Sequence, residues 1–504
     1  MDRARFNVHR ATRRTALGFF GVGAVGFALA EMVGADTPAL PTRPAARTGN
    51  NPLVAENRLA GARWRPSGAK EVDDLRRQVQ GYASKTSAGH GEVVDFHVSV
   101  ADGGEFDAEI HRVGHYGGAG GRLMARGPGL AAEEHAPPSP EPDAGRVVCA
   151  WPVSWSVTIP AAWPSGLYVA SFTDREGHRA HTPFVVREPS RSSDILVIVP
   201  VTTYQAYNMW PADETNGRNL YKGYTPEGVT DGALRAMEVS FDRPYTGVGL
   251  PSWFEMETSF ASWAEERGHD LTYATSLDLH EGRLDPRLYT AIVFTGHDEY
   301  WSKAMRDAAE KAVEVGTHLA FLASNNIYFH IRLEAGNRRI ACYKDPGTDP
   351  APDAAGQTVR WRRLAKGLRK AEQRLLGVQY NGMLAAPAPM VVREAGHWFW
   401  AGTGLRDGDE IPGLVGVEAD GVDPKSPSPK KSEQTLLSAS PYDDSLGRGV
   451  RTQNTSLCVD GRKTMVFVAG TFHWPLALVP GEHSNEHVRV ATGNLIDRML
   501  APRS

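Results

Sequence analysis

Cysteine is scarce in this chain of 504 residues, which contains only Cys149, Cys342 and Cys458. They lie far apart, so they form no CxxC motif and no disulfide framework, and at most one disulfide is possible. We predict that all three are buried free thiols. The HExxH, P-loop and GxSxG motifs are missing as well, as is a GxGxxG sequence after a strand. These absences argue against the common zinc-peptidase, nucleotide-binding and serine-hydrolase sites.

A strong charge of one sign is also lacking. The formal net charge is −4, from 55 basic and 59 acidic side chains. Without a basic field, nucleic acid is not an expected partner. After about residue 30 no apolar run is long enough to span a bilayer, so we expect no membrane span once a signal is removed. The composition is that of a globular protein, and the length suits two or three domains.

The N-terminus does carry a targeting pattern. Residues 12–20 read TRRTALGFF, a twin-arginine sequence, and an apolar stretch follows to about residue 30. We therefore predict a twin-arginine signal over residues 1–35, export by that route, and an extracellular or cell-envelope location. An uncleaved membrane anchor is the alternative, although the apolar stretch is short and rich in glycine.

Composition divides the rest of the chain into further parts. Residues 36–90 are rich in Pro, Ala, Arg, Gly and Ser and indicate a linker, with one possible helix over 69–82. Residues 91–188 alternate in short runs between turn residues, at the spacing of a β-sandwich. Residues 193–504 show buried-strand patterns with helices between them, a rhythm that predicts a parallel sheet. The predicted core strands of this last part are 194–200, 269–274, 289–295, 317–323 and 464–468.

The heptapeptide GHDEYWS at residues 296–302 is the most informative segment. It follows the predicted strand 289–295 and precedes a predicted helix, 302–315, which Ser302 can cap. A polar cluster at a strand-to-helix junction lies where open α/β sheets bind ligands. Other strands of a parallel sheet end at the same edge, so we expect polar residues that follow them to join one site.

Four consecutive side chains of this segment can take part in proton transfer or metal binding: His297, Asp298, Glu299 and Tyr300. In an extended segment alternate residues share a face, so His297 pairs with Glu299, or Asp298 with Tyr300. We predict His297 or Glu299 as the proton carrier, with Asn325 or Tyr204 as hydrogen-bond donors to a substrate. Tyr300 could ligate a strongly acidic metal ion, which would displace its proton, or it could simply pack under a loop.

Two carboxylates elsewhere are further candidates. Glu257 opens the helix that contains Trp263 and heads an apolar stripe, so it is either an N-terminal helix charge or a buried ligand. Glu418 follows the strand-like run 413–417 and is either an ordinary loop carboxylate or a ligand. Sequence pattern alone leaves both alternatives open.

Several segments together resemble the large (beta) subunit of N,N-dimethylformamidase, and more closely the family that carries its C-terminal domain. They include TYQAYNMW at 203–210, the helix around Trp263, GHDEYWS at 296–302, GLVGVE at 413–418 and AGTFHW at 469–474. The likeness covers roughly residues 90–500. It implies a glutamine-amidotransferase-like α/β domain with a Rossmann-like parallel sheet over 193–504. An immunoglobulin-like β-sandwich over 91–188 would precede it.

The same resemblance implies a mononuclear ferric site of two tyrosines and one glutamate, which activates water to hydrolyse a small amide. Hard oxygen donors suit such a hard ion. Tyr300 matches the tyrosine of the family motif, and Glu418 is matched to the glutamate. The second tyrosine is expected on the helix before Trp263, where this chain offers Glu257. The implied iron ligands are therefore Tyr300, Glu418 and Glu257.

Our functional hypothesis is an exported hydrolase of carbon–nitrogen amide bonds that acts on a small-molecule amide. A homo-oligomer is compatible with the sequence. The alternative is a noncatalytic cell-surface or carbohydrate-binding protein that keeps the fold. In that case Trp210, Trp301 and Trp474 would line a binding groove.

Overall fold

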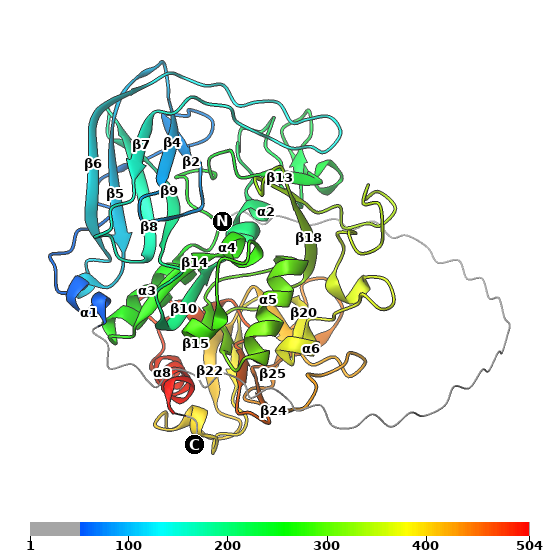
Figure 1. Cartoon of the computed structure of the whole chain (residues 1–504). Helices are drawn as coiled ribbons and strands as arrows, with labels where there is room; N and C mark the ends of the chain where they lie inside the picture. Colours follow the sequence, from blue (N-terminus) through cyan, green and yellow to red (C-terminus); the bar gives the residue numbers. More distant parts are fainter. Residues whose placement is uncertain (1–50, 503–504) are drawn as a thin grey trace, which may run out of the picture. The chain divides into compact units, whose positions relative to one another are not determined.

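Strands make up most of the regular structure in residues 51–502, the part of the chain that the computed structural model describes (Figure 1). The predicted signal at 1–35 lies outside these residues, as does the first part of the predicted linker. The description below therefore begins at residue 51.

Two sheets near the N-terminal end of the described chain share one apolar core, and their strands are drawn largely in blue and cyan in Figure 1. The larger sheet has the order β1-β9-β8-β5-β6, with β3 also paired to β9, and the smaller has the order β2-β4-β7. The Phe96 ring of the smaller sheet lies 5.9 Å from Phe172 and 5.8 Å from Phe184 of the larger one. The strands are β1 (Lys70–Glu71), β2 (Val79–Ala83), β3 (Ser87–Gly89), β4 (Val93–Val100), β5 (Gly104–Val113), β6 (Gly121–Ala132), β7 (Trp155–Thr158), β8 (Gly166–Asp174) and β9 (His178–Arg187).

Part of the predicted linker belongs to these sheets. Strand β2 is buried throughout and pairs antiparallel with β4, so the predicted helix over 69–82 is wrong, and 36–90 is not one continuous linker. The strand is hard to predict from sequence because it contains Gly81, and glycine is depleted in strands. Here its missing side chain makes room for a ring, since a Cβ at Gly81 would lie 2.6 Å from Phe172.

A seven-stranded sheet follows, in the order β14-β10-β15-β17-β28-β27-β24. The first five strands are parallel; at one edge β27 is antiparallel to β28, and β24 is antiparallel to β27. The five predicted core strands are confirmed, with ends shifted by at most two residues. The bounds are β10 (Ser193–Val199), β14 (Leu271–Thr275), β15 (Tyr289–Phe294), β17 (His318–Phe321), β24 (Ser432–Leu436), β27 (Ser456–Asp460) and β28 (Met465–Val468). Parallel pairing brings five carboxyl ends to one edge, where ligands bind in such sheets.

Two helices of this part begin directly after a capping residue. Helix α5 (Lys303–Glu314) begins after Ser302, whose hydroxyl accepts from the Met305 N–H at 3.3 Å. Asn485 caps α8 (Glu486–Leu500) in the same way. The other helices used below are α2 (Val201–Tyr207), which follows β10 directly, and α3 (Glu255–Glu266).

The end of the heptapeptide enters a second sheet before α5 begins. Strand β16 (Tyr300–Ser302) pairs parallel with β18 (Phe329–Glu334), so that Tyr300 lies opposite Phe329. The order of this sheet is β13-β19-β18-β16, with β13 at Glu238–Ser240 and β19 at Arg339–Ala341. Four two-stranded ladders complete the described part: β11 (Gly223–Tyr224) with β12 (Thr230–Asp231), β20 (Gln379–Met383) with β23 (Glu418–Gly421), β21 (Ala388–Val391) with β22 (Glu410–Val415), and β25 (Ser440–Asp443) with β26 (Val450–Gln453). The glutamine-amidotransferase-like and immunoglobulin-like classes stay predictions.

The cysteines behave as predicted, since all three are buried and unpaired. Burial raises the pKa of Cys458 to about 11 and of Cys342 to about 12, so both thiols stay protonated at neutral pH. A protonated, buried thiol is a poor nucleophile and a poor metal ligand. Within residues 51–502 no helix is both long and apolar enough to cross a bilayer.

Candidate active site

The turn after β15 places His297 and Glu299 against each other. The His297 Nε2 lies 3.2 Å from the Glu299 Oε2, and both side chains are buried. On the other side of the ring, Nδ1 lies 3.1 Å from the Ser324 carbonyl oxygen. A carbonyl and an ionised carboxylate both only accept, so the two contacts place one proton on Nδ1 and a second on Nε2. Of the two pairings that alternation allows, the structure shows His297 with Glu299.

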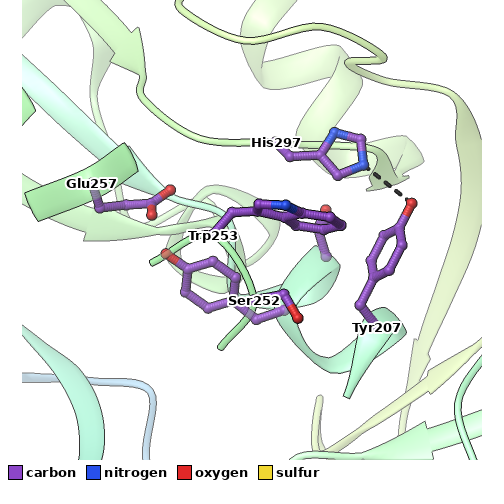
Figure 2. A pocket seen from close by; sticks show the side chains of 7 residues that line it. Tyr207, Ser252, Trp253, Glu257 and His297 are labelled. Carbon is purple, nitrogen blue, oxygen red and sulfur yellow. Dashed lines mark hydrogen bonds between the residues drawn. The ribbon is translucent and has the colours of Figure 1, made fainter. Parts of the chain in front are cut away.

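Two tyrosines complete this group. Tyr207 is the last residue of α2, and Tyr221 lies in the loop before β11. The Tyr207 hydroxyl donates to Glu299 Oε2 at 2.6 Å, and the Tyr221 hydroxyl lies 2.8 and 2.7 Å from the two Glu299 oxygens. The two hydroxyls are 2.9 Å apart, and Figure 2 shows Tyr207 directed at the His297 ring. We call Tyr207, Tyr221 and Glu299 the oxygen triad.

The charges around the triad favour an ionised carboxylate between two neutral phenols. Burial and the Glu299 charge raise the pKa of Tyr207 and Tyr221 well above the ordinary value. Burial would also raise the pKa of Glu299, but the His297 hydrogen bond and charge, together with the Lys344 charge, lower it instead. The Lys344 amine lies 3.6 Å from the centre of the Tyr221 ring. A bound multivalent cation would instead lower the pKa of both phenols, because its own charge favours phenolate.

A second carboxylate faces His297 from β23. The Glu418 Oε2 lies 4.0 Å from the His297 Nε2, and burial, with the Glu299 charge, raises the pKa of Glu418 to about 7. Asn325 donates from its side-chain amide to Glu418 Oε2 at 2.8 Å, and from its backbone N–H to Asp420 at 2.8 Å. The Asn325 side chain therefore holds Glu418 in place beside the histidine.

The oxygen triad fits a hard cation by the chemistry of its donors. It offers two phenol oxygens and a carboxylate, with 2.6–2.9 Å between neighbouring oxygens. Hard oxygen donors of this kind favour hard, highly charged ions. Among residues 51–502 no group of three or more His, Cys, Asp and Glu side chains could hold a metal, so the tyrosines distinguish this place. Its composition, two tyrosines and one glutamate, is also the one that the sequence resemblance implies.

Comparison with known proteins agrees with the resemblance. The family described as "N,N-dimethylformamidase beta subunit-like, C-terminal" matches residues 107–487. The chain belongs to this family. No curated protein matches the chain. Among solved structures it is similar to a Paenibacillus sp. cycloisomaltooligosaccharide glucanotransferase complexed with cycloisomaltoheptaose, at 9% identity and a TM-score of 0.17. That similarity spans 51% of this chain and 53% of the other, and so low a score does not show a shared fold.

In this N,N-dimethylformamidase-like chain, Glu257 makes no hydrogen bond to the triad, although it lines the same small cavity as Tyr207 and His297. It is in the first turn of α3 and is buried, and a Cβ at Gly296 would lie 1.8 Å from its Oε1. Tyr204 is the hydroxyl that faces it. In Figure 2 the Trp253 side chain lies between Glu257 and Tyr207. The carboxylate thus borders a cavity of about 10 Å³, which has room for about one water molecule.

Tyr300 packs behind the triad. Its ring stacks on Phe329 with the centroids 5.2 Å apart, and it lies 6.3 Å from the rings of both triad tyrosines. Burial and the nearby carboxylates Glu299 and Glu418 raise the pKa of Tyr300 well above the ordinary value. The structure therefore brings Tyr300 and Glu418 close to the triad, whereas Glu257 reaches it only across the small cavity that it shares with Tyr207.

Sequence reading missed Tyr207 and Tyr221. Tyr207 stands in the TYQAYNMW segment three residues after Tyr204. Which of the two hydroxyls faces Glu299 depends on the orientation of α2, which the sequence does not give. The structure turns the Tyr204 hydroxyl to Glu257 and the Tyr207 hydroxyl to Glu299. Tyr221 lies in an irregular loop, where no periodicity marks it.

The predicted aromatic groove is wrong. The side chains of Trp210, Trp301 and Trp474 are each 0% exposed, so they cannot stack on a ligand at the surface. They pack in the core, where the Trp474 indole N–H, for example, donates to the Thr492 hydroxyl at 3.1 Å. This removes the observation on which the carbohydrate-binding alternative depended.

Changing Glu257 to glutamine is expected to stabilise the protein increasingly as pH rises above about 4.5, and most of all at alkaline pH. Burial raises the pKa of Glu257 from 4.5 to about 8, and the Tyr204 hydroxyl moderates the rise. The unfolded chain ionises near the lower value, so wild-type stability falls as pH rises above it, and the loss is complete above the folded pKa. The variant escapes this loss, and its free energy of unfolding should be higher by roughly 2–4 kcal/mol at pH ~9.

Urea unfolding at acidic and alkaline pH measures this difference. Glu255→Gln, at an exposed carboxylate in the same turn of α3, serves as the matched control and should change little at either pH. A gain for Glu257→Gln that is equally large at pH ~4 would contradict the assignment, because both states are protonated there.

Proposed function

We propose that this member of the N,N-dimethylformamidase-like family is a metal-dependent hydrolase of small amides. The oxygen triad, Tyr207, Tyr221 and Glu299, would hold a hard cation such as ferric iron. The observation that carries the proposal is the convergence of two phenol oxygens and one carboxylate beside a buried histidine. Family membership supports it independently. This ligand set takes the place of the Tyr300, Glu418 and Glu257 set implied by sequence.

A bound cation of this kind supplies Lewis acidity, which polarises a carbonyl and makes water more acidic. The protein's own part is proton transfer and positioning. In amide hydrolysis the water oxygen bonds to the carbonyl carbon, the C–N bond breaks, and the leaving nitrogen gains a proton. His297 Nε2 faces the triad and is the group placed to carry that proton.

Four neighbours keep the histidine in position. The Ser324 carbonyl accepts from Nδ1, and Glu418 lies on the Nε2 side, where Asn325 holds it. The Phe472 ring packs on the imidazole with the centroids 4.5 Å apart, and the Trp253 ring lies 5.5 Å away at 90°. Such packing restricts ring rotation and water access at the proton carrier.

We also propose export by the twin-arginine route, on the sequence pattern at residues 12–20. Secretion of the full chain compared with a variant in which Arg13 and Arg14 are lysines tests this. Folded protein in the exported fraction of wild type, and its loss in the variant, is the expected outcome.

Changing His297 to glutamine is expected to lower kcat for amide hydrolysis roughly 100-fold while bound metal stays at about one ion per chain. The proton carrier is lost, whereas the triad oxygens remain. Metal analysis and turnover of an amide panel, on protein purified after expression with iron, measure both quantities. His487→Gln, at a histidine whose ring faces the Thr403 carbonyl, is the control and should change neither.

The same measurements on wild type test the proposed function itself. Less than about one metal ion per three chains, with no amide turnover and no loss of stability on chelation, would refute it. Full metal content with unchanged turnover in His297→Gln would retain the metal site and remove His297 from the reaction.

A further inference from the structure

An open cleft is lined in part by Tyr328, whose backbone N–H donates to the Glu299 carbonyl oxygen. It has a volume of about 440 Å³, and its lining includes four arginines but only one carboxylate, Asp423. The arginines are Arg360, Arg362, Arg448 and Arg451. In a chain with a net charge of −4, such a concentration of guanidinium groups in one hollow is a distinct local feature. It favours an anionic occupant.

Three of these arginines already have carboxylate partners. Arg362 donates to Glu372 at 2.8 Å, and Arg448 and Arg451 both lie within 3.0 Å of Asp444. Arg360 differs, because it forms no ion pair with any carboxylate among the described residues. Its guanidinium lies 5.0 Å from the centre of the Tyr328 ring, which can position it without neutralising it.

The cleft is connected to the triad through its aromatic wall. The backbone N–H groups of Tyr328 and Phe329 donate to the Glu299 carbonyl oxygen at 2.8 and 3.0 Å. Phe329 also forms a backbone bridge with Arg360. A second residue of the wall is Tyr380, whose ring lies 5.1 Å from the Tyr328 ring. The charges of Glu418 and Glu299 both raise the pKa of its hydroxyl.

A further cation packs against the triad next to Phe329. Lys344 contacts the Tyr221 ring at 3.6 Å and the Phe329 ring at 4.5 Å. Phe329 is also the residue that forms the backbone bridge with Arg360, so Arg360 and Lys344 are both neighbours of this ring.

We propose that this cleft binds the carboxylate of the substrate, with Arg360 as its partner, so that the substrate class is amides bearing a carboxylate, such as N-acyl amino acids. The inference rests on the proposed amide hydrolysis and names the substrate class for it. A guanidinium fork matches a carboxylate with two parallel hydrogen bonds. The four arginines exceed the nearby carboxylates Asp423, Glu372 and Asp444 by one charge, which suits a monoanion better than a phosphate dianion.

Two substrates of matched size test the proposal: N-formylglycine, which has a carboxylate, and N-propylformamide, which does not. Formate release is measured with metal-loaded wild type and with Arg360→Gln. Wild type should prefer the acid, and Arg360→Gln should lower kcat/KM for the acid roughly 10- to 100-fold while leaving the neutral amide unchanged. Arg360→Lys, which keeps the charge and loses the fork, should recover part of the preference. Arg363→Gln, an exposed arginine outside the lining, is the charge-matched control.

Calorimetric titration with N-formylglycine separates this inference from the proposed function. Binding that wild type shows and Arg360→Gln loses supports the carboxylate site, even if neither substrate is cleaved and the hydrolase proposal fails. Cleavage of both substrates at equal rates, with no effect of Arg360→Gln, overturns the inference and leaves the hydrolase proposal standing. An equal loss of kcat/KM for the acid and the neutral amide in Arg360→Gln also overturns it, because Arg360 would then act on folding or on the metal site. Tighter binding of inorganic phosphate than of N-formylglycine would overturn the choice of a carboxylate.

Discussion

Changing Glu299 to glutamine is expected to abolish both metal binding and amide hydrolysis. The carboxylate accepts from both triad tyrosines and is the ionised member of the group, so its loss removes the charge that attracts a cation. Loss of an outer-shell partner already costs about 10- to 100-fold in metal affinity, and loss of a ligand costs more. Metal analysis after dialysis and formate or amine release from a panel of amides measure the two effects.

Two tyrosines of the same helix provide a matched pair for the assignment. Tyr207→Phe should lower metal affinity at least about 100-fold and weaken any phenolate-to-metal absorption band. Tyr204→Phe makes the same chemical change three residues earlier in α2, where the hydroxyl faces Glu257, and should retain the metal and the colour. The opposite pattern, with colour lost only in Tyr204→Phe, would show that the ligand assignment is wrong. Tyr300→Phe should resemble Tyr204→Phe.

Removal of the Arg112 guanidinium is expected to lower the free energy of unfolding by roughly 3–5 kcal/mol. Arg112 of β5 donates to both Glu265 oxygens of α3, at 2.6 and 3.0 Å, and both side chains are 0% exposed. Arg112→Met leaves the Glu265 carboxylate buried without its counter-charge, which costs far more than the net worth of the pair. The double variant Arg112→Met, Glu265→Leu removes both charges and should recover most of the loss.

Denaturant unfolding of the two single variants and the double variant measures this coupling. Arg126→Met is the control. Arg126 of β6 is 67% exposed and pairs with Glu109 of β5, so its loss should lower the free energy of unfolding by less than about 1 kcal/mol. If the double variant were no more stable than Arg112→Met, the loss would arise from packing around the long side chain and not from the unpaired charge. Amide hydrolysis by the folded variants should be unchanged, because neither residue touches the triad.

Local structure in the α/β part was largely predictable. The run 289–295 is short, apolar and partly β-branched, and it forms β15; Ser302 and Asn485 cap helices as their chemistry indicates. Prediction failed at Gly81. This glycine makes room for Phe172, and its presence led to the prediction of a linker where the structure has a buried strand. It failed again at the three tryptophans, because an aromatic side chain has the same sequence signature in a core as in a groove.

In the candidate site, too, one part could be predicted from sequence and another part could not. The pairing of His297 with Glu299 follows from alternation along an extended segment, which is a local property. The identity of the two tyrosines is not local. Tyr207 and Tyr221 come from a short helix and an irregular loop, and both reach Glu299 only because β10 and β15 pair in parallel and end at one edge.

The sequence by itself determined the family, the parallel strands of the α/β part and the segment that carries His297 and Glu299, because these depend on residue type and on short-range spacing. The tertiary structure alone decided which oxygens meet, which arginine lacks a partner and where Glu257 lies. Those properties depend on side-chain orientation and on contacts between segments far apart in the chain, such as Tyr207 with Glu299, 92 residues apart, and Arg112 with Glu265, 153 residues apart. Such contacts are set by packing of the whole domain, and no local pattern encodes them.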